Sequence, residues 1–293
     1  MSLSSSAPPT QKKAYQALLT QEVNNKLAGL ESGCGFTQLI NNALHLEHDQ
    51  YVLVVGWNFH QRLQLTAWAT RSCIVKLSTA ATTPNTPETL PLVSARSKLQ
   101  NDLVKFRTTQ FNLFPSLQPL ISSVDPTTPE KEDLRLPSSF SETFRTAYGL
   151  DDLAKIEYAL REGQAHDALE SIRKAIKIFN HNLDIKKSFV FGQHANTRAQ
   201  GFLKQLAADK VNGADKYRRT RLALLKLGLA ENDPVLQELH DDQLWGKDTS
   251  HMSQLGDSKI QDPWFWSVGR PSGLSQAEDL EWSVERKSSF VVR

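Results

Sequence analysis

The stretch LREGQAHDALESIRKAIKIF, residues 160–179, decides the fold class of this chain. Its small and apolar residues recur every three or four positions, which is the spacing of one face of an α-helix. They form a single stripe: Ala165, Ala168, Leu169, Ile172, Ala175, Ile176 and Phe179. Because small side chains let a second helix approach closely, the stripe predicts antiparallel helices packed together over residues 150–228.

Two further features of this stretch have simple structural interpretations. Gly163 is interpreted as a break between two helices, since glycine tolerates the left-handed conformation found at helix ends. Arg173, Lys174 and Lys177 are interpreted as cations near the C-terminal end of a helix, where they suit the helix dipole. Neither feature requires chemistry of its own.

The N-terminal half of the chain also has helical spacing. A helix is expected from Thr10 to Gly29, and a longer one over residues 36–78. Residues 51–59 alone also fit a buried strand, and that alternative stays open. A third helix is expected over residues 92–114, ending there because a proline at 115 clashes with the preceding turn.

Toward the C-terminus, SSFSETFRTAYG (138–149) predicts a short helix with a serine cap, because a serine oxygen can accept from the free amides of the first turn. A helix of about thirty residues is expected to end near Gly228. We therefore predict an all-α fold, an elongated antiparallel helical bundle with long helices, flexible linkers and a largely irregular C-terminal tail.

The expected domain organisation follows from these segments and from the Pro- and Ser/Thr-rich stretches between them. It consists of a disordered start (1–9), an N-terminal helical segment (10–79), a linker (80–91), a helical core (92–228, with a loop at 122–137) and a mostly irregular tail (229–293) that contains the aromatic sequence PWFW (263–266).

Composition restricts the class of protein. The chain has 293 residues, a formal net charge of +2 and 39% hydrophobic residues, so it is long enough for a sizeable core but is not strongly basic overall. Its two cysteines, Cys34 and Cys73, have no spacing that indicates structural zinc. The apolar run at 51–59 is far shorter than the roughly 20 residues of a spanning helix, so no membrane association is expected. We expect an intracellular protein, nuclear if associated with DNA and otherwise cytoplasmic.

No arrangement of residues indicates catalysis. Carboxylate pairs occur at Asp151/Asp152, Glu47/Asp49 and Asp241/Asp242, but no predicted sheet brings them together around divalent ions. His45 and His48 lie on one helical face, yet no further ligand motif completes a zinc site. We therefore expect no enzyme, no metal site, no cofactor and no small-molecule substrate.

Basic residues are concentrated between residues 151 and 228, where fifteen Lys/Arg face nine Asp/Glu. In the last helix Leu203, Leu206, Ala214, Tyr217, Leu224 and Leu225 share one side, which defines the buried face. Five candidate nucleic-acid-binding residues lie beyond that face or at its edge: Arg198, Lys204, Arg218, Arg219 and Lys226. Such a row can contact DNA phosphates, although a solvated helix surface has the same pattern.

Several uncommon strings occur in order along the chain: LREGQAHDALESIRKAI, FGQHANTRAQGFLKQL, ADKYRRTRLALLKLG and LGDSKIQDPWFW. Together they resemble the C-terminal region of KDZ (Kyakuja–Dileera–Zisupton) transposases over about residues 96–285. Members of that family, which are common as mobile-element remnants in fungal genomes, are expected to carry a metal-dependent DDE nuclease and zinc modules upstream of the matched region. In the string GQHANTRA, Gly192 is expected to turn the chain and Asn196 or Thr197 to cap the long helix.

The resemblance implies a non-catalytic helical remnant of a transposase, without the catalytic core. Its remaining activity would be weak, non-specific DNA binding or oligomerisation with transposase copies or with itself. The alternative is a helical-repeat-like protein–protein interaction scaffold, because EGQAHDALESIRKAI also resembles the second helix of a tetratricopeptide unit. An intact enzyme is the third hypothesis, which metal-dependent strand cleavage would support.

Overall fold

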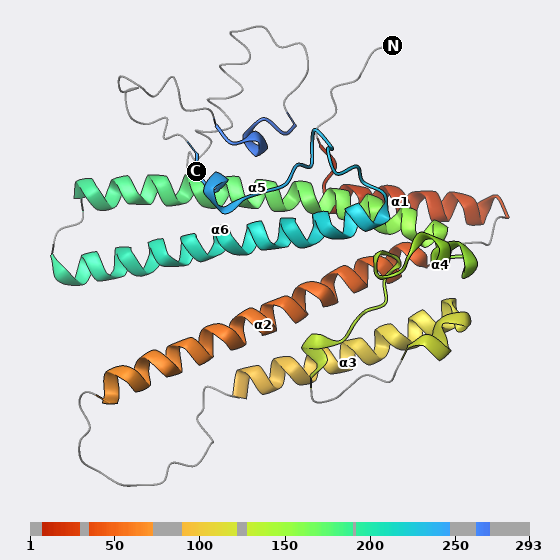
Figure 1. Ribbon diagram of the computed structural model, residues 1–293, viewed down its shortest axis with the longest axis horizontal. Helices are drawn as coiled ribbons and strands as arrows, with labels where there is room; N and C mark the ends of the chain where they lie inside the picture. Colours follow the sequence, from red (N-terminus) through yellow and green to blue (C-terminus); the bar gives the residue numbers. More distant parts are fainter. Residues whose placement is uncertain are drawn as a thin grey trace, which may run out of the picture. The chain divides into compact units, whose positions relative to one another are not determined.

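The computed structural model describes residues 8–29, 35–72, 90–121, 128–189, 192–246 and 262–269 (Figure 1). In these ranges the chain forms α-helices and short 3-10 turns, and no strand occurs in them. The helices are α1 (Gln11–Leu27), α2 (Phe36–Ser72), α3 (Leu90–Leu113), α4 (Glu142–Ala147), α5 (Asp151–Phe189) and α6 (Gln193–Leu227). The predicted all-α class is confirmed.

The chain folds as two compact units, each described here by itself. The hairpin unit comprises the described residues of Met1–Ala17 and Tyr158–Arg293, and the second unit comprises those of Leu18–Glu157. The boundaries predicted at residues 79, 91 and 228 stay predictions. The linker expected at 80–91 lies mostly outside the described residues, as does most of the start expected to be disordered.

In the hairpin unit, α5 and α6 run side by side in opposite directions (Figure 1). The predicted stripe on α5 is buried from Ala165 to Ile176, and it packs in one cluster with Ala214, Tyr217 and Leu224 of α6. The helices approach so closely that a Cβ added at Gly213 would lie 2.9 Å from Cγ1 of Ile172. The antiparallel packing inferred from small residues is therefore confirmed.

The interpretation of Gly163 as a helix break was wrong, because α5 is continuous through it. Glycine is needed there for space: a Cβ would lie 2.6 Å from the backbone nitrogen of Gln11 and 2.7 Å from the carbonyl carbon of Thr10. The Gln11 amide also donates to Asp167 on the next turn of α5, at 3.0 Å. The start of α1 therefore lies directly against the backbone of α5.

The placement of Arg173, Lys174 and Lys177 near a helix end was also wrong, since α5 continues to Phe189. Arg173 is buried in the middle of this helix, where its guanidinium binds backbone carbonyls of the C-terminal segment. A charge there is compensated by hydrogen bonds, as burial of a cation requires. The helix dipole therefore does not explain this residue.

In the second unit, α2 packs antiparallel to α3 (Figure 1), and Leu39 and Ile40 of α2 and Leu103 of α3 are buried. Residues 51–59 belong to α2, so the strand alternative is wrong. Helix α3 ends just before Pro115, as predicted. The serine cap of α4 is confirmed too, because Ser141 Oγ accepts from the Phe144 amide at 3.4 Å.

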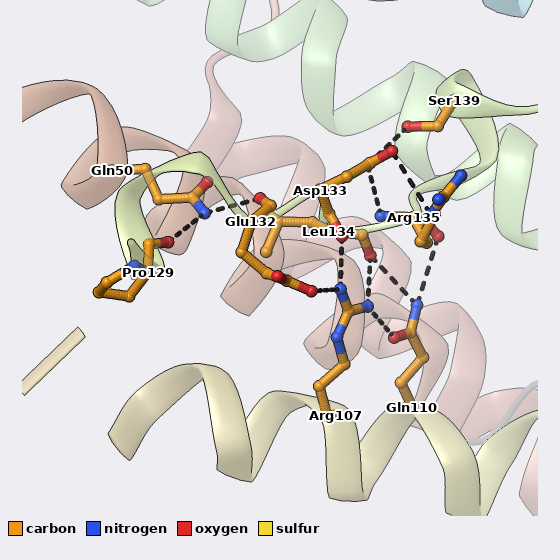
Figure 2. A network of polar contacts seen from close by, with 9 residues as sticks. All are labelled: Gln50, Arg107, Gln110, Pro129, Glu132, Asp133, Leu134, Arg135 and Ser139. Carbon is orange, nitrogen blue, oxygen red and sulfur yellow. Dashed lines mark hydrogen bonds and ion pairs between the residues drawn. The ribbon is translucent and has the colours of Figure 1, made fainter. Parts of the chain in front are cut away.

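The described part of the expected 122–137 loop, residues 128–137, is fastened to α2 and α3 by side chains (Figure 2). Gln50 of α2 donates to the carbonyls of Pro129 and Glu132, at 3.0 and 2.8 Å. Arg107 of α3 forms an ion pair with Glu132 at 2.7 Å and also donates to the carbonyls of Asp133 and Leu134. In an irregular segment, backbone carbonyls have no hydrogen-bond partner from a helix or sheet, and these buried side chains supply one.

The expected irregular tail has no α-helix in its described parts, but it is not detached. The return segment (residues 229–246) and the strap (residues 262–269) contribute Leu229, Leu236, Leu239, Leu244, Phe265, Trp266 and Val268 to the same buried cluster as α5 and α6. Phe265 is completely buried, so the PWFW sequence completes the core of the hairpin unit.

Candidate nucleic-acid interface

Glycines define both ends of α6, the helix that carries the candidate DNA-binding residues. Gly192 is the residue preceding the first turn, with φ of 90°, and Gly228 ends the helix in the left-handed conformation, with φ of 112°. The Leu229 amide returns to the Leu224 carbonyl at 2.9 Å, as glycine-terminated helices commonly do. The predicted cap at Asn196 or Thr197 was wrong, because the helix begins three residues earlier.

Three of the five predicted residues, Arg198, Lys204 and Lys226, have exposed side chains on α6. On a helical wheel they lie outside the arc occupied by the buried Leu206 and Tyr217. From the first of the three to the last, α6 rises roughly 42 Å at 1.5 Å per residue, somewhat more than one turn of duplex DNA. They are therefore spread along the exposed length of α6, and their role in DNA binding stays a prediction.

The other two predicted residues are half-buried and take part in internal contacts. Arg218 donates through Nε to the Leu239 carbonyl at 2.9 Å and pairs with Asp241 at 2.6 Å and Asp215 at 3.3 Å. Arg219 donates to the Asp215 carbonyl at 3.3 Å. Two of the five predicted side chains therefore form contacts within the hairpin unit. Their role in DNA binding stays a prediction.

Other basic residues of α5 and α6 share this structural task. Lys210 donates to the Leu244 carbonyl at 3.0 Å, and Arg221 donates to the carbonyls of Leu236 and Glu231, each at 2.9 Å. Their acceptors belong to the return segment, as do the Leu239 and Asp241 partners of Arg218. Lys210, Arg218 and Arg221 therefore attach the return segment to α6, and this structural role accounts for part of the local excess of positive charge.

Sequence analysis missed this role of Arg173, Lys210 and Arg221. Each partner is a main-chain carbonyl, which every residue type carries, so side-chain identity gives no signal at the acceptor end. The only available signal is the combination of a long basic helix with a proline-containing, helix-poor segment of 18 residues, 229–246, after it.

An acidic group lies on the same unit. Glu162 of α5 is half-buried, and burial together with the carboxylate of Asp233 raises its pKa above the ordinary value. Burial and the carboxylates of Glu162 and Asp233 raise the pKa of the neighbouring Tyr158. The Asp233 side chain is itself an acceptor for the amides of Val235 and Leu236, at 2.9 and 2.7 Å. The Glu162 carboxylate therefore lies near the negative charge of Asp233, which accepts hydrogen bonds from two backbone amides of the return segment.

Replacing Glu162 by glutamine is expected to raise the Tm at pH 8 by about 1–2 °C, a small value because the side chain is partly solvated. A carboxyl whose folded-state pKa is raised stabilises the fold below the ordinary pKa of 4.5 and loses that contribution as the pH rises through the folded value. The gain should therefore disappear at pH 4. Thermal unfolding followed by circular dichroism measures both, with Glu231→Gln as the exposed control, and an equal gain at the two pH values would contradict the expectation.

In the described part of the chain, no group of three His, Cys, Asp or Glu side chains is placed to hold a metal ion. His45 and His48 are exposed on α2. Asp151 and Asp152 occupy the first turn of α5, where negative charge favours the helix dipole. Among the described helices, none has a stretch long and apolar enough to span a bilayer.

Comparisons with family models, with curated proteins and with solved structures find no match to this chain. The geometry of α6 and of the segments bound to it is therefore the basis for assigning a role.

Proposed function

We propose that this chain is a non-catalytic helical module related to the C-terminal region of KDZ transposases, and that it binds DNA weakly and without sequence preference. The observation that supports DNA contact is the exposure of Arg198, Lys204 and Lys226 along one helix. Lysine and arginine contacts of this kind act on phosphates and carry no base information. Such a protein would act inside the cell and, when bound to DNA, in the nucleus.

Replacing Arg198, Lys204 and Lys226 together by glutamine is expected to remove most of this affinity. Three phosphate contacts give a dependence of log K on log salt of about −2.7, so the variant's slope should be flatter by about 2–3. Fluorescence anisotropy of a labelled duplex, titrated at several salt concentrations, measures the slope. Glutamine maintains helix propensity, so the fold should be unaffected.

The matched control removes three exposed lysines of α1, with Lys12, Lys13 and Lys26 replaced by glutamine. This variant has the same change in net charge and should retain the wild-type slope. A flat titration of the wild-type chain at low salt would contradict the DNA proposal. Equal losses in both variants would show a non-local charge effect and would contradict the assignment to α6.

The alternative, a protein–protein interaction scaffold, has one specific observation in its favour. The α5–α6 hairpin already binds an eight-residue aromatic segment, residues 262–269, through side-chain hydrogen bonds and buried rings. Surfaces that bind a short segment of this kind have the features of a peptide-recognition site. Capture of a peptide ligand without DNA binding would favour this function.

A further inference from the structure

The strap (residues 262–269) contacts its binding surface as a peptide ligand does. Its own backbone forms a short 3-10 turn, in which the Trp266 amide donates to the Pro263 carbonyl at 3.0 Å. The Trp264 and Trp266 side chains then reach outward to the return segment. Trp264 Nε1 donates to the Glu238 carbonyl at 3.1 Å, and Trp266 Nε1 donates to the Trp245 carbonyl at 2.9 Å.

Arg173 supplies the main polar contact on the helix side. Its Nε and one terminal nitrogen lie 2.9 and 2.5 Å from the Phe265 carbonyl oxygen, and the same terminal nitrogen lies 3.3 Å from that of Val268. Its other terminal nitrogen pairs with Glu170 at 2.8 Å. A buried guanidinium is thereby held by its own helix in the orientation that binds two carbonyls of a turn.

Shape complementarity adds specificity for the aromatic rings. A Cβ on Gly246 would lie 2.5 Å from Cζ2 of Trp266, so the indole packs directly on backbone at that position. Trp264 lies with its ring 5.8 Å from that of Tyr217, between centroids. We call this surface, formed by Arg173, Tyr217, Trp245 and Gly246, the strap seat.

The strap and its seat are separated in sequence by fifteen residues, 247–261. Fully extended, such a segment spans up to about 50 Å, far more than the return to Gly246 requires. For two groups joined through about fifteen residues, the effective concentration of one at the other is on the order of millimolar. The strap of a neighbouring molecule carries the same rings and carbonyls, and it can enter the seat whenever its concentration competes with that value.

We propose that the strap seat is a peptide-binding site whose occupant is the aromatic strap of this chain, exchanged with a second copy at high concentration. Exchange of an identical element between two copies produces a closed dimer without any new type of contact. The proposal does not depend on the DNA-binding proposal, because neither Arg198 nor Lys204 contributes to the seat.

The first test uses the full-length chain with Phe265→Ala and Trp266→Ala, which removes the two most buried rings of the strap and weakens its hold on the seat, and a fluorescein-labelled peptide of residues 262–269. The peptide should bind this variant at least about tenfold more tightly than it binds the wild-type chain, whose own strap competes. The same peptide with Phe265 and Trp266 replaced by alanine should not bind. A peptide with Ser267→Ala loses only the exposed hydroxyl that donates to the Trp264 carbonyl at 2.6 Å, and it should bind at most about tenfold more weakly than the wild-type peptide.

The second test needs no variant for its main readout. Wild-type chains with and without ¹⁵N labelling are mixed at 10–500 µM, a range chosen to approach the millimolar effective concentration of the tether. Native mass spectrometry should show mixed dimers that increase with concentration and are absent when both copies carry the double substitution. Monomers throughout the range, or dimers that persist in the double variant, would overturn strap exchange. Loss of helical circular dichroism in the double variant would overturn it too, because the strap would then be an inseparable part of the core.

Discussion

Replacing Arg107 by alanine is expected to lower the free energy of unfolding by about 3–5 kcal/mol, the usual cost of removing one partner from a buried ion pair. The side chains of both partners are largely buried, with 5% of Arg107 and 16% of Glu132 exposed, so water cannot replace the lost contacts. Gln110 and the carbonyls of Asp133 and Leu134 lose a donor at the same time (Figure 2). The local consequence should be release of residues 128–136 from α3.

Urea unfolding followed by circular dichroism measures the global effect, and hydrogen exchange across residues 128–139 measures the local one. Lys105→Ala on the same helix is the matched control, because its pair with Asp102 is solvent-exposed and should contribute about 1 kcal/mol or less. Arg107→Lys should have an intermediate effect, since an ammonium cannot reproduce the guanidinium contacts. Equal small losses for Arg107→Ala and Lys105→Ala would contradict the role assigned to the network.

Replacing Gly163 by alanine is expected to destabilise the protein by about 1–3 kcal/mol, the usual cost of overpacking a close contact. The direction is diagnostic, because alanine in a helix interior is otherwise more favourable than glycine by about 1 kcal/mol. The added methyl group would meet backbone atoms of Thr10 and Gln11 at 2.6–2.8 Å, and backbone cannot move aside as a flexible side chain can.

Gly201 of α6 is the matched control, since nothing lies within 4 Å of a Cβ placed there. Gly201→Ala should therefore stabilise the protein by about 0.5–1 kcal/mol. Thermal and urea unfolding of the two variants should give changes of opposite sign. Stabilisation by both substitutions would mean that the start of α1 does not lie against α5 in solution.

Periodicity was sufficient to predict the all-α class and the buried faces of α5 and α6. The stripe from Ala165 to Ile176 and the buried face of α6 are visible in the sequence because helix geometry turns a spacing of three or four residues into one surface. The serine cap at Ser141 and the stop at Pro115 were also predictable, since each depends on one residue and its neighbours.

The role of Gly163 could not be read from the sequence in this way. A glycine that ends a helix and a glycine that admits a second backbone have the same local sequence signal, and only the position of Gln11 distinguishes them. Helix α5 continues through the glycine because its long buried stripe on both sides outweighs a local cost of about 1 kcal/mol.

The contacts of the candidate interface were only partly predictable. Exposure of Lys204 follows from the helical wheel, whereas the contacts of Arg218 depend on where Leu239 and Asp241 return along α6. Return paths of irregular segments are set by long-range packing, which has no periodic signature in the sequence.

Arg173 attaches the strap through hydrogen bonds between groups that do not change protonation state. A guanidinium does not lose its proton in proteins, and an amide oxygen does not ionise over the range in which proteins stay folded. The junction between Arg173 and the carbonyls of Phe265 and Val268 therefore has no titrating member. These two hydrogen bonds therefore persist through acidification or alkalinisation that would open a carboxylate–histidine pair.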